Sequence, residues 1–177
     1  AVLALALAAT AAAQNYPGKA VRIVVPYPPG GGTDVVARTI AQKMNEVLGQ
    51  PAIVDNRAGA NGIIGTDQVA KAPADGYTLM ITSSPLFGVV PLLYSKLGFD
   101  PFKDFTPITH LADTPLLMTV NANLPAKTTQ DWIALARAKP GGLNYGSAGV
   151  GGLIQFAMEM FNRMARIETV HVPFKGG

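Results

Sequence analysis

Two glycine-rich stretches contain the residues of this chain best suited to bind an anion. The first, PYPPGGGTD, covers residues 26–34, and the second, YGSAGVGG, covers residues 145–152. Glycine exposes backbone N–H groups because it has no Cβ, and the first turn of a helix has N–H donors without an intrahelical partner. Where such a stretch opens a helix, the sequence predicts an anion site built from backbone donors. A tight turn between a strand and a helix is the alternative reason for the glycines.

The first stretch does not match the common phosphate-binding motifs. A P-loop requires a lysine directly after its last glycine, and none follows Gly32. A dinucleotide fingerprint requires G-x-G-x-x-G, whereas the glycines at 30–32 are contiguous. These departures disfavour a nucleotide as the anion.

Ser147, in the second stretch, could be a nucleophile. It does not sit in the G-x-S-x-G elbow of many hydrolases, because Tyr145 occupies the place of the first glycine. The two histidines, His110 and His171, are far apart in apolar or β-like segments, so we expect neither to bind a metal or act in catalysis. An exported serine hydrolase is therefore the weaker, enzymatic alternative.

Alternating strand and helix patterns position the first stretch. Residues 23–25 are branched aliphatics typical of a buried strand. Apolar residues recur every three to four positions from 36 to 47, which predicts a helix with Gly32 or Thr33 as its N-cap and a stop at Gly49.

The same alternation continues and predicts a largely parallel sheet. Further elements are expected as strands at 52–54 and 77–82 and helices at 66–72 and 86–93. Because ligands bind beyond the carboxyl ends of parallel strands, Thr82 and Ser83 should share a rim with the first glycine stretch. Helix capping is the alternative role of these hydroxyl groups.

The sequence changes character after Phe99. Prolines and β-forming residues predict a crossing into a second lobe at about residues 102–106, followed by a strand at 116–121. Thr128, with Asp131 three residues later, predicts a capping box at the start of a helix in which Trp132 packs into a core or hinge. The remaining expected elements are a strand at 143–145, a helix at 154–164 and a strand at 169–172.

Composition excludes several classes of protein. The 177 residues contain no cysteine, which excludes a disulfide framework or a lipid-anchored cysteine within this sequence. The net charge of +3 is mild and its lysines and arginines are scattered, so no nucleic-acid surface is expected. Residues 1–13 read as the remnant of a signal peptide. Gln14 and Asn15 end this apolar run, so we expect export to the periplasm and no membrane-embedded segment.

Several segments together resemble the Bug-type solute-binding proteins of tripartite tricarboxylate transporters. They are IVVPYPPGGGTDVVAR, VDNRAGANGIIGTDQVAKAPADGYTLMI, YGSAGVGG and VPFKGG, and the match runs from about Tyr16 to the last residue. The resemblance implies an α/β, two-lobed, hinged periplasmic-binding-protein-like (type II) fold. Lobe 1 would cover residues 14–103 and lobe 2 residues 104–177. Lobe 2 is expected to be incomplete, because family members continue well beyond VPFKGG.

The resemblance also implies the function. The expected protein is a receptor that captures a small mono-, di- or tricarboxylate between its lobes and delivers it to membrane transporter subunits, without cofactor, metal or turnover. A periplasmic sensor that passes the same ligand to a sensor kinase is the alternative.

The resemblance implies a site of backbone N–H groups and small hydroxyls. The positions carried over are Pro29, Gly30, Gly31, Gly32, Asp34, Thr82, Ser83, Gly146, Ser147, Ala148, Gly149, Gly151, Gln155 and Lys175, with Gly176 nearby. Where the family often has Ser or Thr followed three residues later by His, this chain has Gly152 and Gln155. We also expect Leu153, Phe156, Met160 and Phe161 to lack apolar partners, and the chain to aggregate or melt broadly.

Overall fold

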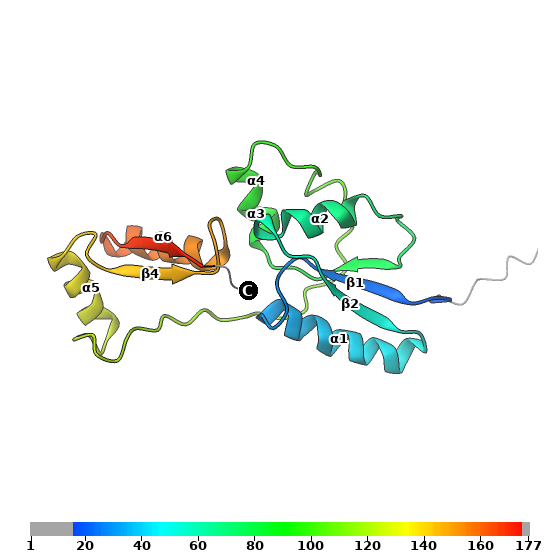
Figure 1. Ribbon diagram of the computed structural model, residues 1–177, viewed down its shortest axis with the longest axis horizontal. Helices are drawn as coiled ribbons and strands as arrows, with labels where there is room; N and C mark the ends of the chain where they lie inside the picture. Colours follow the sequence, from blue (N-terminus) through cyan, green and yellow to red (C-terminus); the bar gives the residue numbers. More distant parts are fainter. Residues whose placement is uncertain (1–15, 175–177) are drawn as a thin grey trace, which may run out of the picture.

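Two α/β bodies joined by a long extended segment make up the molecule (Figure 1). The computed structural model of the chain describes residues 16–174, so the predicted signal-peptide remnant at 1–13 lies outside the described part. The first body has a sheet of order β2-β1-β3 and the second a sheet of order β4-β5. The predicted two-lobed α/β architecture is confirmed, and the two glycine-rich stretches belong to different sheets.

The sheet of the first lobe is parallel throughout. Its central strand, β1 (Val21–Val25), pairs with β2 (Ala52–Asn56) on one side and with β3 (Thr78–Met80) on the other. Parallel strands are buried on both faces, which explains why β1 is an almost unbroken aliphatic run. The third strand is shorter than the predicted 77–82.

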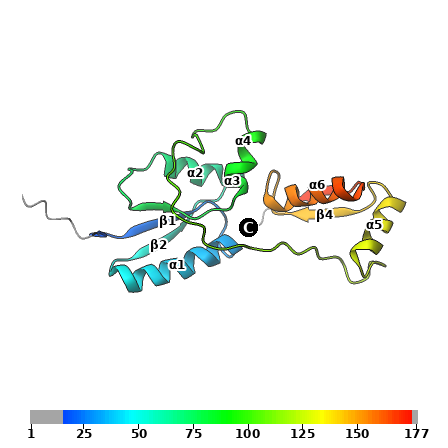
Figure 2. The same ribbon diagram turned by 180° about the vertical axis from the view of Figure 1, so that it is seen from behind.

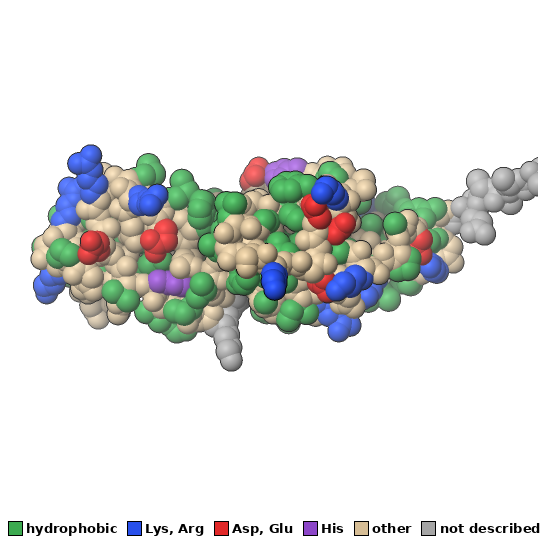
Figure 3. Space-filling model, turned by 90° about the horizontal axis from the view of Figure 1, so that it is seen from above, with side chains coloured by type: hydrophobic (Ala, Val, Ile, Leu, Met, Phe, Trp, Pro, Cys, Tyr) green, Lys and Arg blue, Asp and Glu red, His purple; other side chains and the backbone are tan. Residues whose placement is uncertain are grey.

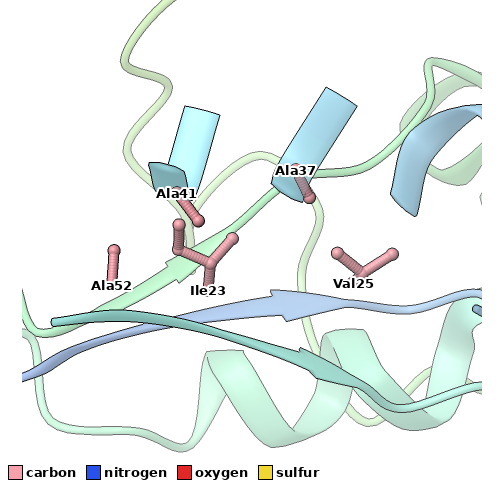
Figure 4. Close-up of a cluster of buried hydrophobic side chains, with 5 residues drawn as sticks. All are labelled: Ile23, Val25, Ala37, Ala41 and Ala52. Atoms are coloured by element: carbon pink, nitrogen blue, oxygen red, sulfur yellow. The ribbon is translucent and has the colours of Figure 1, made fainter. Parts of the chain in front are cut away.

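Helix α1 (Gly32–Leu48) covers one face of this sheet. Ala37 and Ala41 are small enough to bring the helix close to Ile23 and Val25, and these residues form the buried core with Ala52 (Figure 4). The helix ends at Gly49 in the left-handed conformation, as predicted.

The opposite face carries α2 (Ile63–Ala70), preceded by the short η1 (Ala60–Gly62), as the two views of the ribbon show (Figures 1 and 2). Beyond β3, the predicted helix at 86–93 is two short helices, α3 (Pro85–Gly88) and α4 (Val90–Leu93). Pro91 explains the break, because proline has no N–H and its ring clashes with the carbonyl four residues earlier.

Three phenylalanines hold the chain where it leaves the first lobe. The ring of Phe105 meets Phe87 and Phe99 edge-on, with centroids 5.5 and 5.7 Å apart. Beyond this cluster the chain has no regular structure up to residue 121, and the predicted strand at 116–121 is wrong. Leu117 is 86% exposed, and no strand in residues 16–174 pairs with this segment. An aliphatic run favours a strand only where a partner satisfies its backbone.

Within the described residues, the second lobe contains four elements. They are α5 (Thr129–Ala138), β4 (Asn144–Ser147), α6 (Leu153–Ala165) and β5 (Val170–Pro173). Strands β4 and β5 pair in parallel. The predicted capping box between Thr128 and Asp131 is confirmed, and Trp132 is buried in the core of this lobe as expected.

Apolar partners along α6 differ from the prediction. Phe161 packs on Trp132, with ring centroids 5.7 Å apart, so the expectation that it lacks a partner is wrong. Leu153 is half-buried, whereas Phe156 and Met160 are 45% and 49% exposed. Hydrophobic side chains also reach the surface over both lobes (Figure 3). Of the helices in the described residues, none is both long and apolar enough to cross a bilayer.

Candidate functional site

The two glycine-rich stretches form equivalent loops on the two lobes. Each connects the carboxyl end of a parallel strand, β1 or β4, to the start of a long helix, α1 or α6. Figure 1 shows the beginning of α1 and the arrowhead of β4 directed toward the space between the lobes, and Figure 2 agrees. We call residues 26–34 the first loop and residues 145–152 the second loop.

Both helices begin in the same way. The N-cap of α1 is Gly31, with φ −77° and ψ 168°, and the N-cap of α6 is Gly152, with φ −79° and ψ 166°. The predicted N-cap of α1, Gly32 or Thr33, is therefore wrong by one or two residues. Neither glycine has a side chain to accept from the first-turn N–H groups, so these donors remain available to an anion. In contrast, the Thr128 side chain caps α5.

The first loop leaves space at its glycines. A Cβ on Gly30 or Gly32 would meet no atom within 4 Å, and Gly32 does not require the left-handed region. Contacts within the protein therefore do not require glycine at position 32. The open space lies directly over the first turn of α1, where a ligand could approach the backbone, and Pro29 lies exposed just before it.

Asp34 holds the first loop from within. Its carboxylate is 3% exposed and accepts the N–H of Gly30 at 2.9 Å, the Nε–H of Arg38 at 2.9 Å and an Nδ2–H of Asn56 at 2.9 Å. The hydrogen bond from Arg38, then those from Gly30 and Asn56, lower the pKa of Asp34 to about 2. Because both oxygens already accept from the protein, Asp34 fixes the shape of the loop and adds negative charge beneath it.

Thr82 and Ser83 lie on the same rim as the first loop, as predicted. Tyr27 of that loop brings its hydroxyl within 2.8 Å of Ser83 Oγ and 3.3 Å of Thr82 Oγ1. Neither side chain caps α3, whose N-cap is Ser84 without a side-chain hydrogen bond. Helix capping, the alternative role predicted for these hydroxyls, is therefore not seen.

The second loop is ordered by its own side chains. Ser147 is 6% exposed, and its Oγ accepts the N–H of Gly149 at 3.1 Å. Gln155 reaches back from α6 so that its Oε1 accepts the N–H of Gly151 at 2.6 Å. An amide oxygen therefore occupies a backbone donor that the prediction assigned to the ligand. Gly146 and Ala148 lie exposed on either side of Ser147.

Asn61 links the two lobes, and sequence reasoning missed it. Its Nδ2 donates to the carbonyl of Val150 in the second loop and lies 3.3 Å from Tyr94 Oη in the first lobe. A Cβ on Gly151 would come within 3.1 Å of the same amide, and Gly151 has φ +82°, so the contact requires glycine. Asn61 itself is left-handed, with φ 54°. An Asn before a Gly tolerates this conformation, and the ANG triplet was the available signal.

Ser147 also has a histidine partner, His171, which lies 24 residues later in the sequence. Nε2 of His171 lies 2.6 Å from Ser147 Oγ. In the described residues no carboxylate pairs with His171, so the serine and histidine lack the acid of a hydrolytic triad. No group of three or more potential metal ligands occurs within residues 16–174.

The remaining predicted positions do not enter this geometry. Lys175 and Gly176 lie outside the described residues. A groove of about 630 Å³ lies along the second half of α6 and is lined by residues from 141 to 170 that include neither loop. It is open surface and contains none of the predicted site residues.

Comparison with known proteins gives one family. The family model described as "Tripartite tricarboxylate transporter family receptor" matches residues 36–177. The chain is 37% identical over 171 residues to Protein BugT of Bordetella pertussis, covering 96% of this chain and 52% of BugT.

Two solved structures are similar throughout. One is Rpa4515 of R. palustris with adipate, with a TM-score of 0.85 and 40% identity, covering 91% of this chain and 54% of that one. The other is MatC (Rpa3494) from Rhodopseudomonas palustris with bound malate, with a TM-score of 0.77 and 33% identity, covering 91% of this chain and 55% of that one. The chain thus spans about half the length of the proteins it matches.

Proposed function

This chain belongs to the family of tripartite tricarboxylate transporter receptors, and we propose that it captures a small mono-, di- or tricarboxylate between its first and second loops. One observation carries the proposal: both α1 and α6 begin at an uncapped glycine with the same extended backbone. The adipate and malate bound by two similar proteins support a carboxylate as the anion.

The energetics favour the use of both loops. A hydrogen bond to a charged group contributes about 1.5–3 kcal/mol, and a charge at a helix N-terminus about 0.3–1 kcal/mol, or up to about 2 when partly buried. Micromolar affinity requires about 8 kcal/mol. One loop supplies only part of this, whereas two loops on one dicarboxylate reach it.

We further propose that the receptor works in the periplasm and hands its ligand to membrane subunits of a transporter. The family description and the apolar sequence at residues 2–13 support this assignment. The matching family model describes receptors, and two similar proteins hold a bound acid, so the hydrolase alternative is set aside.

Titration of ¹⁵N-labelled chain with adipate and malate tests the proposal, because amide shifts detect even millimolar binding. We expect shifts at the amides of Gly31 and Gly32 and of Gly149 to Gly152, and none with the matched diamides. Gly32→Val should abolish the shifts by placing bulk over the first turn of α1, where no other atom of the protein lies within 4 Å of a Cβ.

The control is Ala134→Val, which adds similar bulk on an exposed position of α5. Equal binding of acids and diamides, or unchanged binding by Gly32→Val, would show that the loops do not hold the carboxylate. Hydrolysis of a carboxyl ester that is lost in Ser147→Ala would restore the enzyme hypothesis.

A further inference from the structure

The contact between buried Ser147 and half-buried His171 connects the second loop to a titratable ring. Parallel pairing of β4 and β5 sets Tyr145 opposite His171, which places the imidazole beside the serine at the strand end. Ser147 Oγ lies 2.6 Å from Nε2 of His171, 3.0 Å from the carbonyl of Gly149 and 3.1 Å from the N–H of Gly149. One hydroxyl proton therefore has two acceptors within the protein.

The protonation state of His171 decides where that proton goes. A neutral imidazole with its proton on Nδ1 accepts the hydroxyl proton of Ser147 at Nε2. An imidazolium instead donates from Nε2, so that both lone pairs of Oγ accept, one from His171 and one from Gly149. The hydroxyl proton of Ser147 is then released from His171, and a carboxylate oxygen over the loop competes for it only with the carbonyl of Gly149.

We propose that His171 is a positioning residue whose protonation turns Ser147 into a donor toward the bound carboxylate, so that ligand capture takes up a proton. The inference rests on the proposed function and adds its coupling to pH. It involves no covalent step: one proton binds at Nε2, and the hydroxyl proton changes acceptor.

The surroundings of the ring support a role beyond packing. Tyr145 stacks on His171 with centroids 5.0 Å apart, and its hydroxyl donates to Glu159 Oε1 of α6 at 2.6 Å. Burial and then Glu159 raise the pKa of Tyr145, so the phenol stays neutral. Among the described residues, Tyr145 contacts the His171 ring directly, and Glu159 contacts it through the Tyr145 hydroxyl; these two are the titratable groups near the ring. Glu159 supplies a negative charge one ring away from a potential imidazolium.

The chain is well suited to a direct test because it has two histidines, and His110 is a natural reference. His110 lies on the exposed segment between the lobes, 73% exposed. Long-range ¹H–¹⁵N spectra of the imidazoles, recorded from pH 8 to pH 5.5, report the tautomer and the titration midpoint of each ring. Adipate and malate are the ligands, and affinity is measured over the same range.

At pH 8 we expect His171 to carry its proton on Nδ1. Ligand should move the midpoint of His171 to higher pH and leave that of His110 unchanged. Affinity should rise by about tenfold between pH 8 and pH 5.5, the value of one charged hydrogen bond. Ser147→Ala and His171→Leu should make the affinity independent of pH, whereas His171→Gln, a permanent donor, should keep high affinity at pH 8.

The outcomes separate the two proposals. Binding with a flat pH profile, or a pH dependence that survives Ser147→Ala, would overturn the role of His171 and leave the receptor function intact. A proton on Nε2 of His171 at pH 8 in the free protein would overturn it without any ligand. Failure of both acids to bind at every pH would contradict the receptor function itself.

Discussion

At the scale of single residues, side chains shape each loop without occupying its first helical turn. Asp34 accepts from Gly30 in the first loop, and Gln155 accepts from Gly151 in the second. Each oxygen accepts from one glycine N–H just before the helix, and no side chain caps the N–H groups of the helix's first turn. The loops are therefore rigid before a ligand arrives, which lowers the entropic cost of binding.

Asp34→Asn should lower the melting temperature by several degrees at neutral pH, because an amide is a weaker partner for Arg38 and Gly30. The Asp34 pKa of about 2 lies below the ordinary 3.8. Its contribution is therefore complete above about pH 4 and is lost as the pH falls through 2. Melting curves of both proteins between pH 7 and pH 2 should converge at the acid end. Asp113→Asn, at a carboxylate 94% exposed, is the control and should change little. A difference that persists unchanged at pH 2 would contradict the assigned role.

At the scale of elements, α5 differs from α1 and α6 because a side chain caps its N-terminus. Thr128 accepts from the N–H of Asp131, and Asp131 accepts from the N–H of Thr128. The side-chain bond to Thr128 is the first cause that lowers the pKa of Asp131. The Thr128 hydroxyl and the Asp131 carboxylate cover the start of α5, so this helix is less suited than α1 and α6 to hold an anion, and it contributes Trp132 to the core of the second lobe.

Thr128→Ala should reduce the stability of the second lobe by about 1 kcal/mol, the usual cost of losing an N-cap. Urea unfolding followed by fluorescence of Trp132, the single tryptophan, reports this lobe. Thr129→Ala is the matched control, because Thr129 is exposed and makes no cap. Equal shifts of the midpoint in the two variants would show that the cap is not the cause.

Local signals predicted the features that a few neighbouring residues decide. The stop at Gly49 and the capping box at Thr128 depend only on residues within about four positions, and both were predicted. The strand expected at 116–121 was wrong because aliphatic residues show only a preference for extended backbone. They do not show whether a neighbouring strand is available to pair with it. The contact of Ser147 with His171 depends on the register between β4 and β5, which no local pattern contains.

At the scale of the whole molecule, residues 16–174 form two cores that share no residue. Ile23 and Val25 anchor the first, and Trp132 and Ala136 anchor the second. The boundary between the lobes, which we propose at residues 103–104, lies next to the Phe105 cluster that still packs on the first lobe. The lobes meet again where Asn61 reaches Val150.

Ile23→Ala should destabilise the first lobe by about 2–5 kcal/mol, since the side chain is fully buried. Because the cores are separate, the unfolding transition seen by Trp132 fluorescence should stay in place while the transition seen by circular dichroism broadens toward lower temperature. Ile53→Ala, at a residue 54% exposed on β2, is the control. Equal shifts in both signals would indicate a single cooperative unit.

The extended segment after Phe105 also has a consequence for selectivity. It is a covalent tether between the first and second loops. Under the proposed function, once one loop holds a carboxylate, the other meets the same molecule at an effective concentration that is millimolar for short linkers. An acid with two carboxylates gains from this avidity, and an acid with one does not. A preference for dicarboxylates would then come from the segment that connects the loops as much as from any side chain within them.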